Sequence, residues 1–434
     1  MNEYTLVGFV GIFLLLMLFF ARLAVAYAMA VVGFAGYWYL TNFKAAMTLL
    51  SRDMFDVFSS YSLALVPLFV FMGFIAYYSG VSAKLYDVAH KCMGRVRGGL
   101  AMATIAACTA FGAICGSTTA TAATMGTIGL PEMKRYKYGS RLATGSVAAG
   151  GGIGVLMPPS VVLIIYGILT QLSIGELFIA GILPAFMITG LFIVAIVVYC
   201  AIYPEQGPRG ESFSAKDKVV ALLEIWETAL VFLVVMGGMF FGFFTPTKAG
   251  AVGSFTLLLI AVLQRKLSWQ NFNRAVFDTL KTSVMVIMLV AGATIFGHFL
   301  ALTRIPMEGA NLVASLNWPG WAIISLICLI YLVGGCFIDA LALITLTIPI
   351  FYPIVESLGY DLIWFGVIIV LITQMGIITP PVGVNVYIVK GLAPEVPMEE
   401  IFMGVVPFLI ALIVGTAIMI AFPEIATFLP GMIG

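Results

Sequence analysis

Long apolar stretches, separated by short polar breaks, run through the whole chain. Many are close to the ~20 residues that a helix needs to cross the hydrocarbon core of a bilayer. Open strands cannot satisfy their backbone groups in lipid, so this pattern predicts an all-α polytopic membrane protein. The strongest apolar stretches are 5–21, 24–42, 61–80, 98–131, 140–171, 177–203, 226–245, 248–264, 282–302, 320–353, 361–390 and 401–422.

Composition supports this class and excludes others. Hydrophobic residues make up 62% of the 434 residues and charged residues only 9%, whereas a soluble domain has about 25% charged residues. So few charges could not cover the surface of a soluble fold, and so apolar a chain does not stay disordered. A formal net charge of +1 without a long basic run also gives no electrostatic footprint for nucleic acid.

The distribution of Lys and Arg predicts a hairpin over 98–131. The breaks 84–97 and 132–141 are both basic, which places both on the cytoplasmic side. The 34 residues between them are too few for two full crossings of ~20 residues each, and a single crossing would separate the flanks. The middle, from Gly116 to Thr119, is polar. We expect a re-entrant helical hairpin that enters from the cytoplasm and turns near the middle of the membrane.

The stretch 320–353 has the same form with the opposite orientation. Neither of its flanks is basic, so both are expected on the external side. Its middle contains Gly334, Gly335 and the single acid Asp339. This predicts a second re-entrant hairpin that enters from the opposite face.

The two halves of the chain are related by a shift of 222 positions. The shift pairs Pro131 with Pro353 and the double proline Pro158-Pro159 with Pro380-Pro381. Two repeats of opposite topology are common in secondary transporters. The predicted organisation is a first inverted repeat over 1–203 with a broken helix at 140–171, a cytoplasmic connector over 204–225, and a second inverted repeat over 226–434 with a broken helix at 361–390.

Two shorter mixed segments, 43–58 and 265–281, lie at comparable points of the two halves. Trp269 and Phe272 beside basic residues are typical of an amphipathic helix at the membrane interface. An ordinary loop is the alternative for each segment.

Each half has two places where its helices are expected to break at membrane depth, the hairpin tip and the double proline. Prolines remove backbone donors and leave carbonyls unpaired, which is tolerated only where the backbone is protein-buried or lines a cavity. Freed carbonyls and hydroxyls suit a small hard cation such as Na⁺, and inward-pointing helix N-termini favour an anion. We therefore expect two pseudo-symmetric cation sites with an anionic substrate between the two tips.

The candidate residues follow from this arrangement. We expect two or more bound Na⁺ ions and no organic cofactor. Simpler explanations stay open, because Asp339 could be a structural partner of a backbone donor, and Ser117 to Thr119 and the glycines could serve close helix packing. His298 is expected to be a hydrogen-bonded core residue. The predicted Na⁺ ligands are Ser117, Gly152, Gly154, Pro158, Gly335, Asp339, Gly376, Thr379 and Val382, and the predicted substrate-binding residues are Ser117, Thr118, Thr119, Ala340, Pro158 and Pro380.

At these motifs the chain resembles the large membrane subunit of TRAP (tripartite ATP-independent periplasmic) transporters. The resemblance rests on 111–126 with Leu130-Pro131-Glu132-Met133, on 154–160, on 337–353 and on 379–383, and covers nearly the whole chain. It implies Na⁺-coupled uptake of an organic acid, such as sialic acid or a C4-dicarboxylate, across the bacterial inner membrane by an elevator movement. It also implies a small four-helix membrane subunit and a periplasmic substrate-binding protein. Cys115 departs from the serine common in the family, which puts a ligand role of that side chain in doubt.

Other functions are weighed against this one. A standalone Na⁺/dicarboxylate symporter of the same architecture, working without a binding protein, is the main alternative. An intramembrane protease is not expected, because the chain has no His-Glu-x-x-His motif and no Gly-x-Gly-Asp partner for Asp361. A passive channel would conduct without saturable, coupled transport. We expect no enzymatic activity.

Overall fold

The computed structural model describes residues 3–21, 23–315 and 318–432. These residues are mostly helical, and they contain no β-strand, only an isolated bridge between Arg97 and Arg209. The prediction of an all-α protein is confirmed.

The helices fall into two series in chain order. Those up to the connector are α1 (Glu3–Phe20), α2 (Val25–Leu40), α3 (Phe43–Phe58), η1 (Ser62–Ala64), α4 (Leu65–Tyr78), α5 (Val81–Met93), α6 (Gly99–Cys115), α7 (Thr118–Arg135), α8 (Ser140–Leu156), α9 (Val161–Thr170) and α10 (Ile174–Ile202). Those that follow are α11 (Ala215–Glu224), α12 (Trp226–Phe232), the π-helical turn η2 (Leu233–Gly237), α13 (Gly238–Phe240), α14 (Pro246–Leu263), α15 (Trp269–Thr303), α16 (Ile305–Ser315), α17 (Gly320–Gly335), α18 (Ala340–Ser357), α19 (Leu362–Gly376), α20 (Val384–Leu392), α21 (Met398–Ala421), α22 (Glu424–Thr427) and η3 (Pro430–Met432).

Helices that could span a membrane occur in both halves of the chain. Among the described residues, six helices are long and apolar enough to cross a bilayer, or up to eight if two bent helix pairs each count as one span. Gly99–Cys115 and Gly320–Gly335, the first helices of the two predicted hairpins, are shorter apolar helices. At 1.5 Å per residue, each is too short to cross a hydrocarbon core of about 30 Å.

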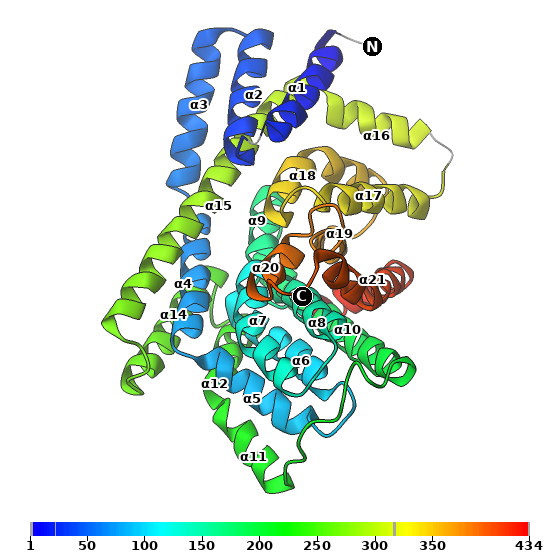
Figure 1. Cartoon of the computed structure of the whole chain (residues 1–434). Helices are drawn as coiled ribbons and strands as arrows, with labels where there is room; N and C mark the ends of the chain where they lie inside the picture. Colours follow the sequence, from blue (N-terminus) through cyan, green and yellow to red (C-terminus); the bar gives the residue numbers. More distant parts are fainter. Residues whose placement is uncertain (1–2, 22, 316–317, 433–434) are drawn as a thin grey trace.

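The helices pack in two groups (Figure 1). The 35-residue helix α15 runs along one side of the molecule and packs on α1, α2, α3 and α4, and α14 also packs on α4. In the second group, α6 and α7 pack on α8, and α8 packs on α19 and α21. The first group thus has the form of a wall beside the helices that carry the predicted site.

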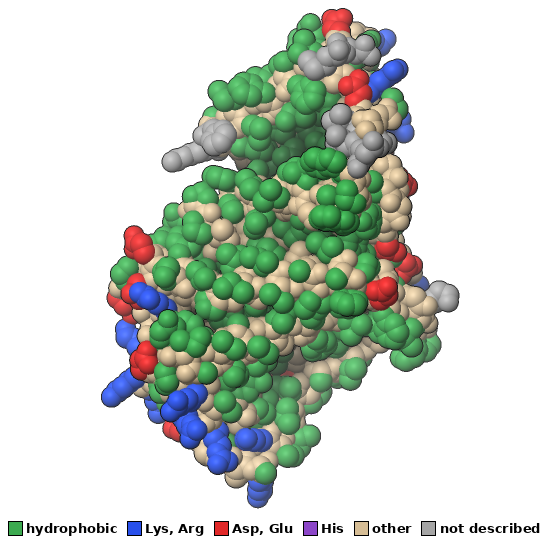
Figure 2. Space-filling view, turned by 90° about the vertical axis from the view of Figure 1, so that its right-hand side faces the viewer, with side chains coloured by type: hydrophobic (Ala, Val, Ile, Leu, Met, Phe, Trp, Pro, Cys, Tyr) green, Lys and Arg blue, Asp and Glu red, His purple; other side chains and the backbone are tan. Residues whose placement is uncertain are grey.

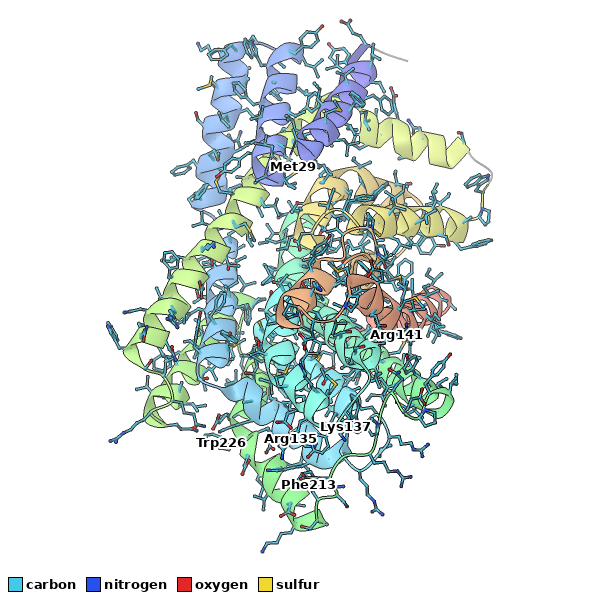
Figure 3. The ribbon with its side chains drawn as sticks, in the orientation of Figure 1. Met29, Arg135, Lys137, Arg141, Phe213 and Trp226 are labelled. Atoms are coloured by element: carbon cyan, nitrogen blue, oxygen red, sulfur yellow. The ribbon has the colours of Figure 1, made fainter. Side chains whose placement is uncertain are left out.

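Lys and Arg side chains are most numerous at one end of the face seen in Figure 2, although charged side chains also lie at the opposite end. Figure 2 shows Lys and Arg at the lower end of one face and a broad hydrophobic middle. Figure 3 places Arg135 and Lys137 at this lower end, near Phe213 of the connector and Trp226 of α12. This end is the one expected in the cytoplasm.

Two segments differ from expectation. Most of the basic break 84–97 is helical, because α5 extends over Val81–Met93 and buries Val81, Leu85 and Val88 on one face. The segment 265–281 is not a separate helix, because α15 begins at Trp269 and continues without a break to Thr303. Segment 43–58 does form its own helix, α3.

Each predicted hairpin crosses the next long helix at a pair of glycines. A Cβ on Gly112 of α6 would lie 2.7 Å from Cα of Gly154 on α8, and a Cβ on Gly335 of α17 would lie 3.2 Å from Cα of Gly376 on α19. Backbones can approach this closely only where side chains are absent. The shift of 222 positions relates the two crossings to within one residue.

Candidate functional site between the two helix tips

The first tip is a two-residue break between α6 and α7. Gly116 ends α6 in the left-handed region at φ 60°, and a Cβ there would collide with the carbonyl oxygen of Pro159. Ser117 then takes an extended conformation, and its Oγ accepts a hydrogen bond from the backbone N–H of Ala120 at 3.4 Å. The sequence Gly-Ser therefore ends one helix and caps the next, with the N-terminus of α7 at the tip.

The second tip lies between α17 and α18 and ends in an acidic cap. Asp339 is in an extended conformation, and its Oδ2 accepts a hydrogen bond from the backbone N–H of Leu341 at 3.1 Å. Asp339 is accessible from the cavity described below, whereas the following Ala340 is buried. A negative cap at a helix N-terminus is favoured by the helix dipole.

One cavity of about 520 Å³ joins the two tips. It receives Ser117, Thr118 and Thr119 from the first tip and Asp339 and Ala340 from the second. Asp339 carries the only formal charge among the described residues that line it. The complete lining is Val70, Phe74, Cys115, Gly116, Ser117, Thr118, Thr119, Ala120, Ala123, Val155, Val161, Val162, Thr282, Met285, Val286, Asp339, Ala340, Leu341 and Ile388.

Oxygen atoms suited to a small cation lie behind the first tip. A Cβ on Gly154 would lie 2.5 Å from Oγ1 of Thr121 and 3.1 Å from the carbonyl oxygen of Ser117. Thr121 is fully buried, and its Oγ1 has no hydrogen-bond partner in the described structure. A buried hydroxyl without a partner is costly, so these neutral oxygens fit a cation ligand set. Thr121 was not among the predicted ligands.

The other predicted residues lie outside this cavity. Gly152 and Gly154 are buried in α8, and Pro158 is buried in the break before α9, whose first residues Val161 and Val162 do reach the cavity. In the second half Gly335 and Gly376 are buried at the helix crossing. The structure therefore does not bring Pro158 or Pro380 to the cavity as substrate contacts.

The second double-proline break is more open than the first. Pro380 is exposed, and Thr379 and Val382 are half-buried, whereas residues 151–160 are all buried. The Oγ1 of Thr379 donates a hydrogen bond to the carbonyl oxygen of Met375 at 2.6 Å. The two breaks are thus alike in sequence but differ in burial.

Sequence reasoning missed the cavity walls that come from distant helices. Phe74 belongs to α4, Thr282 and Met285 to α15, and Ile388 to α20. Thr282, a hydroxyl at the start of an apolar stretch, was the only local signal, because apolar wall residues look like any other membrane-helix residues.

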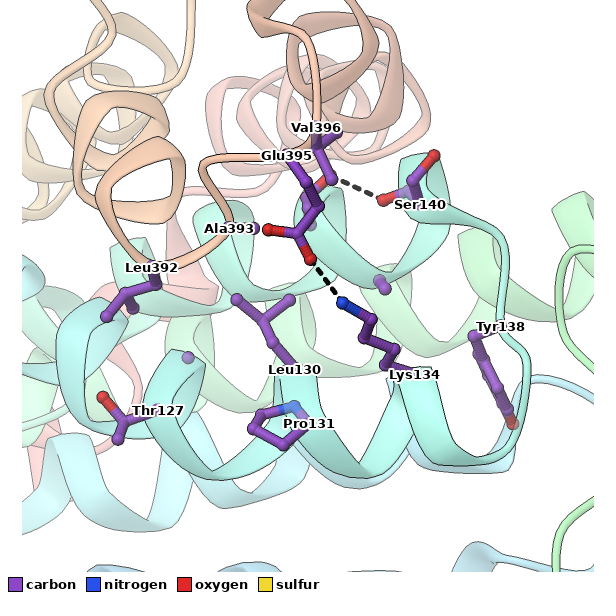
Figure 4. Close-up of a pocket in the computed structure, with 13 residues that line it drawn as sticks. Thr127, Leu130, Pro131, Lys134, Tyr138, Ser140, Leu392, Ala393, Glu395 and Val396 are labelled. Carbon is purple, nitrogen blue, oxygen red and sulfur yellow. Dashed lines mark hydrogen bonds and ion pairs between the residues drawn. The ribbon is translucent and has the colours of Figure 1, made fainter.

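Two larger cavities lie elsewhere among the described residues, besides a small one at Thr5 and Arg304. One of about 580 Å³ lies between α7, α8 and the loop after α20, where Nζ of Lys134 pairs with Oε1 of Glu395 at 2.7 Å (Figure 4). The other, of about 1220 Å³, contains His298, whose Nδ1 lies 2.8 Å from Oδ2 of the buried Asp53. The side chain of His298 is 47% exposed, so it is hydrogen-bonded as expected, but the prediction of a core position is wrong. Neither cavity contains a residue of the two tips.

Comparison with known proteins decides the family. Residues 10–425 match the family described as "Tripartite ATP-independent periplasmic transporter, DctM component". The chain belongs to this DctM family. It is therefore a multi-pass protein of the bacterial inner membrane, as predicted.

Named relatives of this DctM-family chain are transporter permeases rather than enzymes. The chain is 31% identical over 386 residues to the C4-dicarboxylate TRAP transporter large permease protein DctM of Pseudomonas aeruginosa, covering 89% of this chain and 90% of that one. It is 32% identical over 420 residues to the sialic acid TRAP transporter large permease protein SiaM of Vibrio cholerae, covering 95% and 96%. The resemblance seen in the sequence is thus confirmed.

Solved structures with a similar fold are also transporters. The YdaH transporter of Alcanivorax borkumensis matches with a TM-score of 0.63 at 13% identity, over 87% of this chain and 88% of that one. MtrF of Neisseria gonorrhoeae matches with a TM-score of 0.54 at 16% identity, over 87% and 84%. At such low identity these matches show a shared fold and nothing about cargo.

Proposed function

We propose that this chain is the large permease subunit of a Na⁺-coupled importer of an organic acid. The observation that carries the proposal is the cavity in which Ser117 and Asp339, the caps of two helix N-termini from opposite halves, lie together. The relatives named for C4-dicarboxylate and for sialic acid supply the class of cargo. The acid would lie between the tips, held by hydroxyls and backbone N–H groups.

The charge of the cavity supports coupling to a cation. Asp339 is its single charged residue, and the described lining contains no Lys or Arg. A carboxylate cargo would add a second negative charge in a site of low dielectric, where like charges repel strongly. Na⁺ bound at the oxygens near Ser117, Thr121 and Gly154 would offset that charge. Cargo binding would then require Na⁺.

The equivalence of the two halves supports alternating access. Both halves contain a capped tip, a glycine crossing and a double-proline break at positions related, to within one residue, by the same shift of 222. Inverted repeats are related by a pseudo-two-fold axis in the membrane plane, so each repeat can take the conformation of the other, which exchanges the open side. We propose an elevator movement in which the hairpin helices slide against the wall built on α15.

The family's three-part name supports further partners. We propose a small membrane subunit beside this chain and a periplasmic binding protein that delivers the acid. A standalone symporter remains the second candidate for function, because the cavity is complete within this chain.

The deciding experiment is uptake into proteoliposomes with a panel of organic acids. This chain would be tested alone, with the small subunit, and with the binding protein, in Na⁺ and in K⁺. We expect saturable uptake only in Na⁺ and only with all three components. Equal uptake in K⁺ would refute the coupling, and uptake of free acid by this chain alone would establish the standalone symporter.

Matched variants test the site. Asp339→Asn and Ser117→Ala should reduce Na⁺-dependent uptake about tenfold or more, as loss of one charge-assisted contact implies. Asp361 caps α19 through the N–H of Trp364 at 2.8 Å but does not line the cavity, so Asp361→Asn is the control. Ser325 bonds only the carbonyl oxygen of Trp321 on its own helix, so Ser325→Ala is the second control. Wild-type rates in both site variants would remove the assignment.

A further inference from the structure

Two short helices link the wall around α15 to the two hairpins. Helix α5 connects α4 to α6, and helix α16 connects α15 to α17. The shift of 222 positions places α5 and α16 at equivalent points of the two halves. We call them the arm helices, because each connects the wall to one hairpin along the chain.

The arm helix α16 is fixed by a polar contact to α1. The Oγ1 of Thr5 donates a hydrogen bond to Oε1 of Glu308 at 2.8 Å. Thr5 is only 2% exposed, although its neighbours on α1 include the strongly exposed Leu6 and Phe9. Thr5 lies on the packed face of α1 with the buried Gly8, Gly11 and Leu15. Its hydroxyl bonds a carboxylate, so it makes a specific polar contact on a face that is otherwise apolar.

The arm helix α5 is fixed by a polar contact to α12. Oε1 of Glu227 accepts hydrogen bonds from Nζ of Lys84 on α5 and from Nζ of Lys266, the latter at 3.4 Å, before α15. The side chain of Glu227 is 3% exposed, whereas those of Lys84 and Lys266 are about one-third exposed. One buried carboxylate thus holds the arm helix to both α12 and the start of α15.

The two contacts occupy equivalent positions. Residue 5 becomes residue 227 under the shift of 222 that relates the halves. Thr5 belongs to the first half and holds the arm helix of the second, and Glu227 belongs to the second half and holds the arm helix of the first. The equivalent segments of the two halves, α1 and α12, therefore each fix the arm helix of the other half.

We propose that Thr5 and Glu227 are positioning residues that hold the two arm helices and thereby set the resting place of the two hairpins. The inference rests on the proposed function only where it assumes that the hairpins move during transport. Each contact ties a hairpin to the opposite half, so releasing one contact frees one hairpin and leaves the other in place.

Hydrogen exchange of the full chain in lipid nanodiscs, without cargo, tests the proposal. Glu227→Gln should speed amide exchange in α5 about tenfold or more and leave α16 unchanged, and Thr5→Val should do the reverse, as loss of a bond to a charged group implies. Thr48→Val removes a hydroxyl that bonds only Lys44 on its own helix, so it should change neither arm helix. Uniform acceleration across all helices, or no response in either arm helix, would overturn the proposal.

Rescue and distance measurements separate positioning from simple stability. If Glu227→Gln does not fold, Lys84→Gln opens the same contact from the more exposed side. The charge exchange of Lys84→Glu and Lys266→Glu with Glu227→Lys reverses all three charges of the contact and should restore protection of α5. Spin labels at Thr127 on α7 and Val284 on α15, both exposed, should show a broader distance distribution in the Glu227 or Lys84 variant. An unchanged distribution beside faster α5 exchange would refute positioning of the hairpin.

Both measurements test the two contacts without any need for transport. Neither exchange nor distance requires cargo or a Na⁺ gradient. A wild-type protein that imports no acid would refute the proposed function and would say nothing against the two contacts. Unchanged amide exchange of the arm helices in both variants would refute the contacts and would say nothing against transport.

Discussion

Ser117 and Asp339 are equivalent residues of the two halves, and both line the same cavity. They are separated by 222 positions, each is the N-cap of the second helix in its hairpin, and each accepts a hydrogen bond from a backbone N–H of that helix. One cap is neutral and the other is acidic, so the cavity is symmetric in backbone and asymmetric in charge. This asymmetry allows the capping role of Asp339 to be separated from its charge.

Substitution of Asp339 by Asn or by Ala should give different outcomes. Asn is as good an N-cap as Asp, so Asp339→Asn should lose only the smaller contribution of the charge to the helix dipole, whereas Asp339→Ala should also lose the cap, at a cost of about 1 kcal/mol. Both remove the charge, and both should weaken the Na⁺ dependence of uptake. Differential scanning fluorimetry and uptake, measured together, check this. Full Na⁺ dependence in a folded Asp339→Asn protein would show that the carboxylate is only a cap.

The glycine crossing of α6 and α8 should not tolerate a methyl group. A Cβ on Gly112 would lie 2.7 Å from Cα of Gly154, so Gly112→Ala should destabilise the protein by about 1–3 kcal/mol. Gly391 on α20 has nothing within 4 Å of its Cβ position, so Gly391→Ala is the matched control. Thermal unfolding in detergent measures both. Equal melting temperatures would mean that the helices can separate at the crossing without cost.

Acid should destabilise the cytoplasmic end through His90. The imidazole packs against Tyr136 and Phe213 with ring centroids 5.8 and 5.5 Å away. Burial lowers the pKa of His90 below its ordinary value of 6.5. The unfolded chain then binds a proton more readily than the folded one, so stability is full above about pH 6.5 and falls as the pH drops from there through the lower, folded pKa.

Melting curves from pH 7 to pH 5 measure this dependence. His90→Phe keeps an aromatic ring in the cluster and should flatten the curve. The chain has only 2 histidines, so His298→Gln, which changes the other one, is the control and should leave the acid dependence in place. A His90→Phe curve as steep as that of the wild type would assign the effect to carboxylates instead.

The two re-entrant hairpins have a direct topological test. Single cysteines at Val96 and Lys137, which are exposed at the two ends of the first hairpin, should react with a membrane-impermeant reagent from the cytoplasmic side. Cysteines at Trp321 and Glu356 should react from the external side. The six native cysteines would first be replaced. Labelling of positions 96 and 137 from opposite faces would eliminate the first hairpin.

Much of the helical layout could be predicted because the ends of membrane helices are marked by characteristic residues. The polar tip at Ser117 and the double prolines lie at helix breaks in the structure, since Gly, Ser and Pro break or cap helices through their own backbone chemistry. Helix α5 was missed for the converse reason. Its four basic and acidic side chains obscured an apolar face that includes Val81 and Leu85.

The cavity walls could not be predicted from any local pattern. Phe74 and Met285 come from helices far from the tips in sequence, and only tertiary packing brings them to Ser117. The partnerless hydroxyl of Thr121 is likewise visible only when the backbone of Ser117 and Gly154 surrounds it. Expectations for Thr379 and Val382 stay predictions, because the cavity that joins the tips does not reach the second double-proline break.

The apolar part of α15 has the length expected for a helix that crosses the bilayer. Its first four turns carry Arg274, Asp278 and Lys281, and the apolar remainder begins at Thr282 and ends at Thr303. At 1.5 Å per residue that remainder is roughly 33 Å long, the thickness of a hydrocarbon core. If this stretch spans the hydrocarbon core, Thr282 and Met285, which line the cavity, lie near its cytoplasmic edge. We therefore predict that the cavity between the tips lies in the cytoplasmic half of the bilayer, close to the aqueous phase on that side.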